Sequence, residues 1–290
     1  MSTYSESELI LNPDGSIFHL RLFPEQISDH IILVGDPTRV ELIGQFLERG
    51  ENLAANREFI SISGYYNDTK ITVVSTGIGT DNIDIVVNEL DALANINLDS
   101  REDNPGIRRL NLIRIGTSGS LQTDLPAGTA VASAWSVGLD GLMKYYCRAS
   151  DPERELFERT LIKSVNWPDI LPQPYAVKAS SRLLGLVEPY FMTGITVTAH
   201  GFYGPQGRQL RARLAVPDLN SRLQSFRFGE LRTTNFEMEC SALYGLGQML
   251  NHETLTVCLI IANRMTRSFL GEYSAEIKDM VKTTLNSITK

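Results

Sequence analysis

The chain has few of the residues that bind metals or form disulfides. Its 290 residues include 3 cysteines and 4 histidines. Cys147, Cys240 and Cys258 are far apart and odd in number, which favours reduced thiols over a disulfide framework. The histidines do not stand at the spacing of zinc ligands, so the sequence predicts no zinc centre.

Long apolar runs are also missing. No run approaches the roughly 18 residues that a membrane-spanning helix needs. Residues 1–8 are polar and include Glu6 and Glu8, whereas a secretion signal has an apolar core in this region. We therefore expect a protein that is neither secreted nor membrane-embedded, and we place it in the cytoplasm.

Positive charge is in deficit. The chain has 27 Lys and Arg against 34 Asp and Glu, a net charge of −7, which argues against nucleic acid or an anionic membrane as the main partner. A local cluster of arginines remains compatible with this balance. The rest of the composition is that of a globular protein, and nothing marks a domain boundary. We expect a single domain over residues 1–290, with residues 1–16 as a flexible arm.

Strand and helix patterns alternate along the chain. Apolar alternation and short apolar runs predict strands at residues 16–22, 31–34, 57–65, 70–76, 111–119, 128–137, 194–199 and 255–262. Helical spacing predicts helices at residues 37–47, 81–95, 154–165, 175–187, 235–251 and 274–288. Such a series is typical of a three-layer α/β/α fold, whose ligands bind beyond the carboxyl ends of the strands.

The most informative stretch is residues 111–119, Asn-Leu-Ile-Arg-Ile-Gly-Thr-Ser-Gly. It begins as an apolar strand, and its Gly-Thr-Ser-Gly end predicts a turn with free backbone N–H groups. Arg114 adds a planar set of donors, and Thr117 and Ser118 add hydroxyls, a combination suited to a phosphate-like anion. The alternative is a tight turn beside a solvated arginine.

Three other polar segments follow predicted strands or open a helix. Gly35 to Arg39 leads into a helix and is either a second anion site or a simple helix entry. Residues 200–208 carry Gln206 and Arg208 beside aromatics, which suits either a planar amide-containing ring or a plain surface loop. Residues 236–239 place carboxylates at a predicted helix start, where they can bind a ligand or answer the helix dipole.

Taken together, these segments resemble the nucleoside phosphorylase family, and within it the uridine phosphorylase branch. The matching stretches occur in the family's order: Phe18-His19, Gly35 to Arg39, Asn56 to Phe59, Ser75 to Gly79, Arg114 to Gly119, Phe202 to Arg208, Phe236 to Glu239, and Asn263-Arg264. The resemblance covers the chain from about residue 16 onward. It implies a central mixed sheet that is partly barrel-like.

The resemblance also implies roles for individual residues. Phosphate would be bound by Gly35, Arg39, Arg114 and Thr117, with Arg57 reaching it from the neighbouring subunit. Ribose would be held by Thr117, Glu237, Met238 and Glu239, with His19 of the neighbouring subunit near its 5′-hydroxyl. Uracil would be held by Phe202, Gln206, Arg208 and Ile261, with Phe18 across the interface. Arg114, Arg208, Glu239 and His19 would be the catalytic residues.

The shared site implies a homo-oligomer, a dimer or a hexamer. Inorganic phosphate would be a co-substrate, and no organic cofactor is implied. The resemblance also points to a monovalent cation such as K⁺ at the subunit interface, with Glu58, Ile71 and Ser75 at the matching positions.

The choice of branch rests on Gln206 and Arg208, which match pyrimidine-type relatives. Purine-type relatives are expected to carry an aspartate after the last strand, where this chain has Ile261-Ala262-Asn263. His200-Gly201 and Ala262 depart from the family pattern. These departures leave open whether the preferred substrate is uridine, thymidine or deoxyuridine. Residues 142–174 match the family poorly and receive no function.

Three alternatives to a uridine phosphorylase stay open. They are a nucleosidase that uses water, a phosphorylase of broader base range, and a non-catalytic nucleoside-binding protein.

Overall fold

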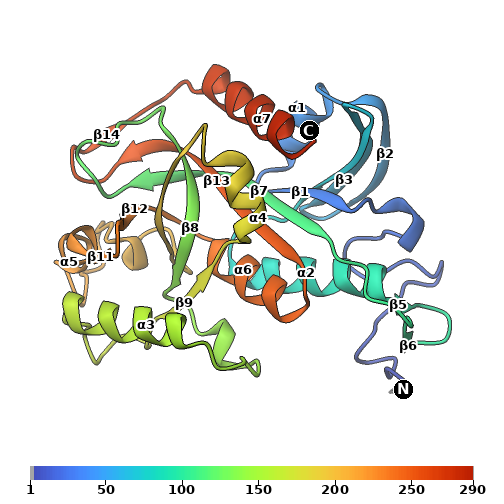
Figure 1. The fold of residues 1–290 in the computed structure, drawn as a ribbon, viewed down its shortest axis with the longest axis horizontal. Helices are drawn as coiled ribbons and strands as arrows, with labels where there is room; N and C mark the ends of the chain where they lie inside the picture. Colours follow the sequence, from blue (N-terminus) through green and yellow to red (C-terminus); the bar gives the residue numbers. More distant parts are fainter. Residues whose placement is uncertain (1–2, 290) are drawn as a thin grey trace.

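The computed structural model describes residues 3–289, and Figure 1 shows their arrangement. Within these residues, five strands close into a barrel. They are β7 (Asn111–Ser120), β8 (Ala130–Gly138), β10 (Met192–Thr198), β12 (Leu231–Glu237) and β13 (Glu253–Asn263). The sheet runs in the order β12-β10-β8-β13-β7, and an antiparallel pairing of β12 with β7 closes it. The barrel confirms the predicted mixed, partly barrel-like sheet.

A sheet extension continues from β7. It consists of β1 (His30–Val34), β4 (Thr69–Ser75), β3 (Phe59–Tyr66) and β2 (Glu48–Asn56). β1 is parallel to both β7 and β4, and β2, β3 and β4 form an antiparallel meander. Short strands complete the sheets: β5 (Ile96–Asn97), β6 (Glu102–Asp103), β9 (Tyr175–Lys178), β11 (Arg227–Phe228) and β14 (Ser268–Phe269).

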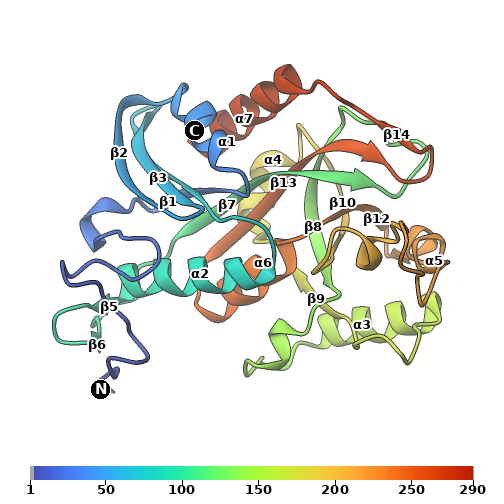
Figure 2. The same ribbon diagram turned by 180° about the vertical axis from the view of Figure 1, so that it is seen from behind.

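Helices cover the sheet on several sides, as Figures 1 and 2 show. α2 (Thr80–Asn95) and α6 (Cys240–Met249) pack together over one face, in an apolar cluster with β1 and β7. α1 (Pro37–Gly44), α4 (Ser181–Val187) and α7 (Ser274–Ile288) enclose a second cluster on the opposite face. α3 (Pro152–Val165) and α5 (Leu219–Ser225) border a third cluster beside the barrel. The predicted three-layer fold is confirmed, and no helix in the described range is long and apolar enough to span a membrane.

Two helix starts follow from the sequence. Asp36 accepts the N–H of Thr38 at 2.9 Å and Pro37 occupies the first turn of α1, so the helix begins where its sequence predicts. α2 begins after Gly79, whose φ of 101° is in the left-handed region that glycine adopts readily. Its apolar residues recur at helical spacing and are buried, which anchors the helix on the sheet.

Several predicted elements are corrected by the structure. Residues 16–22 form a bridge and a turn instead of a strand. Residues 175–187 divide into β9 and α4, and residues 235–251 divide into the end of β12, a turn and α6. Strand β2 was not predicted, because six of its nine residues are exposed and it carries little apolar pattern.

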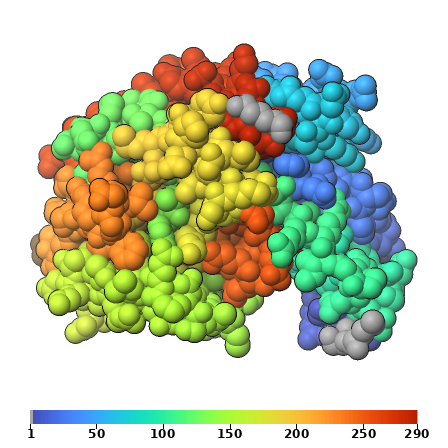
Figure 3. Space-filling view, viewed as in Figure 1, coloured from blue at the N-terminus to red at the C-terminus, as the bar shows by residue number. Residues whose placement is uncertain are grey.

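The N-terminal segment packs against the molecule, contrary to the free arm expected for residues 1–16. Leu9 is buried, and the Tyr4 hydroxyl donates to Asp103 at 2.8 Å. Thr3 pairs with Glu102 of β6. Figure 3 shows this segment beside the turn that carries β5 and β6, where the two project together at the lower right. Residues 1 and 2 of the predicted arm lie outside the described residues.

Candidate functional site

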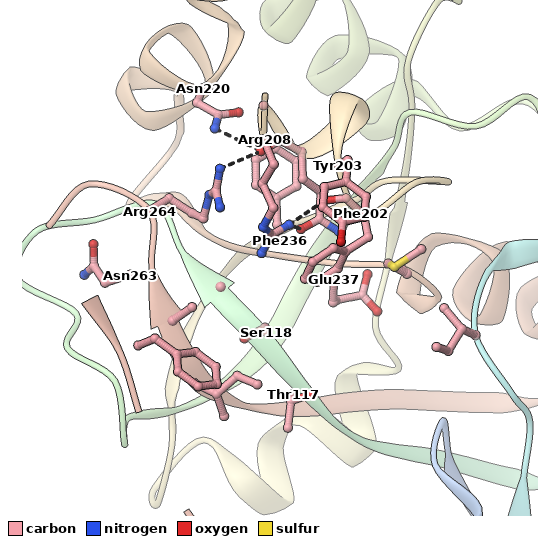
Figure 4. A pocket seen from close by; sticks show the side chains of 18 of the residues that line it. Thr117, Ser118, Phe202, Tyr203, Arg208, Asn220, Phe236, Glu237, Asn263 and Arg264 are labelled. Atoms are coloured by element: carbon pink, nitrogen blue, oxygen red, sulfur yellow. Dashed lines mark hydrogen bonds between the residues drawn. The ribbon is translucent and has the colours of Figure 1, made fainter. Parts of the chain in front are cut away.

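A cavity of about 1200 Å³ opens at the carboxyl-terminal parts of β7, β12 and β13. It is the place where the fold brings most of the predicted site residues together. The predicted residues that line it are Gly35, Arg39, Arg114, Thr117, Phe202, Gln206, Arg208, Glu237, Met238, Glu239 and Ile261. Figure 4 shows part of this cavity, with the ends of several strands around it.

The predicted Gly-Thr-Ser-Gly turn is part of strand β7, which continues to Ser120. Residues 111–120 pair with β13 along one side. On the other side, β1 pairs only as far as Arg114, and β12 pairs only from Gly119 onward. Residues 115–118 therefore have a strand partner on one side only, and this gap in the sheet lies beside the cavity. The gap, in place of a turn, is what leaves room for a ligand here.

Arg114 is buried and lies between two carboxylates. Its Nη2 pairs with Oε2 of Glu239, and its Nη1 lies 3.3 Å from Oε2 of Glu237. Burial by itself lowers the pKa of Arg114, but the nearby Glu239, Cys258 and Glu237 outweigh it and raise the pKa above the ordinary value. The guanidinium is therefore a permanent charge. Its buried Nε has no partner within residues 3–289.

Arg39 approaches the same place from α1. Its Nη2 lies 3.4 Å from the Thr117 hydroxyl. Burial, and then the charge of Arg114, lower the pKa of Arg39 from its ordinary value. A bound anion would relieve this repulsion, so Arg39, Thr117 and Arg114 form a site that favours a phosphate-like group.

The two glutamates of residues 236–239 do different work. Glu237 ends β12, and its Oε2 accepts the N–H groups of Glu239 and Cys240 at 2.9 Å each. This is the helix-start role that the sequence offered as the alternative to ligand binding. Burial raises the pKa of Glu237 despite the opposing charge of Arg114. Glu239 instead turns toward Arg114 and accepts the backbone N–H of Gly79 at 2.7 Å.

The cavity is also lined by an amide and a guanidinium that contact each other. Nη1 of Arg208 donates to Oε1 of Gln206 at 2.5 Å and to the carbonyl of Phe202 at 2.6 Å. The Arg208 guanidinium carbon lies 3.7 Å from the centre of the Phe202 ring, within cation–π distance. Burial, and then the nearby Arg264, lower the pKa of Arg208 to about 10. Gln206 and Arg208 are thus held as a unit. Figure 4 shows Arg208 beside Phe202.

These features belong to a known family. A family profile described as the phosphorylase superfamily matches residues 29–288. The chain belongs to this superfamily. It is 29% identical over 272 residues to a uridine phosphorylase of Thermococcus kodakarensis, covering 91% of this chain and 84% of the relative. It is 26% identical over 278 residues to a DeoD-type purine nucleoside phosphorylase of Streptococcus suis, covering 93% and 98% of the two chains.

A solved structure agrees closely with the whole fold. The crystal structure of a Trypanosoma brucei nucleoside phosphorylase, which shows uridine phosphorylase activity, aligns with a TM-score of 0.84 at 25% identity. The alignment covers 96% of this chain and 98% of that one. The phosphorylase fold therefore accounts for nearly all of the chain.

Two residues beside the Gln206–Arg208 pair were not predicted to have a role. Arg264 follows β13, and its Nη2 lies 3.4 Å from the backbone carbonyl oxygen of Gln206. Asn220 of α5 donates its Nδ2 to the same carbonyl at 3.1 Å. Arg264 belongs to one of the stretches that match the family, so its role could have been predicted from the sequence. Asn220 had no such signal, because α5 was not predicted.

Three predicted residues do not line this chain's own cavity. Phe18 and His19 lie in the 17–20 turn, and Arg57 is exposed between β2 and β3. The segments meet, because Nδ2 of Asn56 donates to the His19 carbonyl at 2.8 Å. The three residues therefore form one group on the surface, outside the lining of the cavity. Their reach into a neighbouring subunit stays a prediction.

The suggested cation positions are occupied by internal contacts. The Ser75 hydroxyl donates to the Glu58 carbonyl at 2.5 Å and accepts the N–H of Ile60 at 2.7 Å. The Glu58 carboxylate accepts from Asn82, and the Ile71 side chain is buried in an apolar cluster. Within one chain these groups do not form an open set of oxygen ligands, and a cation between two subunits stays a prediction.

Proposed function

We propose that this protein is a uridine phosphorylase, which converts uridine and phosphate reversibly to uracil and ribose 1-phosphate. The observation that carries the proposal is the set of groups that line one cavity. They are Arg39 with Arg114, Glu239 paired with Arg114, and the Gln206–Arg208 pair. These three sets suit phosphate, sugar and base, respectively. The uridine phosphorylase relatives support the same choice of substrate.

Phosphate is a poor nucleophile while it is hydrated. The buried Arg114 and the half-buried Arg39 would hold the dianion away from water and in line with the anomeric carbon, which is catalysis by positioning and charge. The sugar then becomes oxocarbenium-like, as in glycoside cleavage, and the adjacent phosphate stabilises that charge. Glu239 would accept hydrogen bonds from the sugar hydroxyls and fix the ring without attacking it.

The base leaves with negative charge on its carbonyl oxygens. Arg208 would neutralise that charge. The Gln206 amide can donate to a carbonyl and accept from a ring N–H, which matches uracil and does not match cytosine. The amide therefore supplies the discrimination between the two bases.

The end of β13 supports pyrimidine over purine chemistry. Both polar atoms of Asn263 are used internally. Its Nδ2 donates to the carbonyls of Gln122 and Leu125 at 2.8 and 2.9 Å, and its Oδ1 accepts two backbone N–H groups. This side chain has no group left to protonate a purine ring.

The proposal also includes a homo-oligomeric assembly in the cytoplasm, with a site shared between two subunits. The grouping of Phe18, His19 and Arg57 on one surface supports the shared site. Sedimentation would give the assembly, and cell fractionation would give the location.

The deciding experiment measures uracil release with and without phosphate, on a panel of uridine, thymidine, deoxyuridine, cytidine and inosine. We expect phosphate-dependent release that is fastest with a uracil nucleoside. Equal rates without phosphate would identify a nucleosidase, and tight uridine binding without turnover would identify a binding protein. Faster cleavage of inosine would assign the enzyme to the purine branch.

A further inference from the structure

Glu89 of α2 is a carboxylate that the reaction above does not use. Its oxygens accept the backbone N–H of His19 at 3.0 and 3.1 Å and the N–H of Leu20 at 2.9 Å. One oxygen also lies 2.6 Å from Nδ1 of His19. The side chain is 13% exposed, so these contacts are shielded from water. Every hydrogen bond of this carboxylate is directed at the turn that carries one histidine.

The 2.6 Å contact fixes where the imidazole keeps its proton. Both Glu89 oxygens already accept backbone N–H groups, so the imidazole is the donor across this contact. A neutral imidazole with its proton on Nδ1 has a free acceptor at Nε2. Within residues 3–289, no hydrogen bond occupies Nε2.

The surroundings hold the ring in the same orientation. The Phe18 and Phe59 rings meet it edge-on, with centres 4.8 and 6.1 Å away. Asn56 grips the His19 carbonyl, and Asn56 directly precedes Arg57. The His19 side chain is 24% exposed, so a molecule on the outside can reach it.

We propose that Glu89 is a positioning residue that keeps the His19 proton on Nδ1 and presents Nε2 as a hydrogen-bond acceptor. The donor would be the 5′-hydroxyl of a nucleoside bound in the neighbouring subunit. This inference rests on the proposed function and on its shared site. Carboxylates orient ligating histidines in the same way, by accepting from the other ring nitrogen.

The kinetic test compares uridine with 5′-deoxyuridine. One hydrogen bond predicts that the wild type prefers uridine by about 3- to 10-fold in kcat/KM. Glu89→Gln keeps the size of the side chain, but its amide N–H can donate to Nδ1. This favours the other tautomer, in which the imidazole proton is on Nε2. We expect the preference to fall to about 1, as in His19→Ala, with no further fall in the double variant. Glu89→Asp, which keeps the acceptor, should recover part of the preference.

A purely structural role for Glu89 would lower kcat/KM for both substrates and leave their ratio unchanged. That result, or the absence of any 5′-hydroxyl preference in the wild type, would overturn the inference.

Long-range ¹H–¹⁵N NMR of the imidazoles reads the tautomer without relying on activity. The chain has 4 histidines, and the signals lost in His19→Asn assign His19. His252 is an internal reference of opposite kind, because its Nδ1 accepts the N–H of Leu110 at 3.2 Å. We expect the His19 proton on Nδ1 in the wild type and on Nε2 in Glu89→Gln. A wild-type proton on Nε2, or the same tautomer in both proteins, overturns the role of Glu89 even if uridine is not cleaved. Absence of uridine phosphorolysis alone would instead sink the proposed function.

Discussion

Gly79 donates its backbone N–H to Oε1 of Glu239 over 2.7 Å, while Oε2 of the same carboxylate pairs with Arg114. The first contact comes from the start of α2 and the second from the middle of β7. Glu239 is therefore fixed between a helix N-terminus and a guanidinium. In the proposed reaction, such preorganisation would remove the cost of orienting the carboxylate toward the sugar.

Replacing this carboxylate should affect the nucleoside more than the phosphate. In Glu239→Gln the sugar hydroxyls lose a charged acceptor, which predicts a loss of about 10- to 150-fold in kcat/KM for uridine. Arg114 keeps its charge and loses one competing partner, so the KM for phosphate should rise by less than about threefold. Steady-state kinetics with each substrate varied in turn checks both. An unchanged kcat/KM for uridine would show that Glu239 does not hold the sugar.

Gly116 makes room for the guanidinium of Arg114, which we propose to bind phosphate. A Cβ at this position would lie 2.2 Å from Nη1 of Arg114 and 2.8 Å from its guanidinium carbon. Gly116→Ala should therefore displace Arg114, destabilise the fold by about 1–3 kcal/mol, and raise the KM for phosphate at least about tenfold. Thermal unfolding and phosphate titration measure the two effects.

Gly185 is the matched control for this substitution. It lies within α4, and a Cβ there would meet nothing within 4 Å. Gly185→Ala should stabilise the helix by about 0.5–1 kcal/mol and leave the phosphate KM unchanged. A normal phosphate KM in Gly116→Ala would show that Arg114 does not need this space.

The elements that the sequence predicted well are those with strong local signals. β1, α1 and β13 combine an apolar run or helical spacing with a clear start or end, and they form where predicted. The failures come from contacts between distant segments. β7 does not turn at Gly116 because β13 pairs with it along its whole length. Residues 235–237 form a strand because β10 lies beside them, a partner that local spacing cannot reveal.

The same contrast applies to the site. Arg114, Gln206 and Glu239 were named because residue type and motif pointed to them, and the fold brings them to one cavity. The separate tasks of Glu237 and Glu239 could not be predicted, because the two residues are chemically alike and two positions apart. Asn220 could not be predicted either, since its contact spans 14 positions and no motif marks it.

Asn220 provides a test of the proposed role of Gln206 in binding the base. Its side-chain Nδ2 donates to the backbone carbonyl oxygen of Gln206 at 3.1 Å. In Asn220→Asp a carboxylate oxygen would face that carbonyl instead, which should loosen Gln206 and lower kcat/KM for uridine about tenfold. The preference for uridine over cytidine should fall with it, while the phosphate KM stays constant.

Ser225→Ala, an exposed change on the same helix, is the matched control. It should leave the base preference intact. If Asn220→Asp kept the wild-type preference, the position of Gln206 would not depend on α5.

Mixing two inactive variants tests the shared site. Arg57→Ala damages the site of the neighbouring subunit, and Arg114→Ala damages the subunit's own site. In a mixed dimer one site would have both substitutions, and the other would have neither. Random mixing of equal amounts should therefore restore about a quarter of wild-type activity, because half of the dimers are mixed and half of their sites are intact. The assay is phosphorolysis after subunit exchange, with each variant exchanged against itself as the control. Recovery no greater than in those self-exchanged samples would mean that Arg57 and Arg114 do not act in one site formed across two subunits.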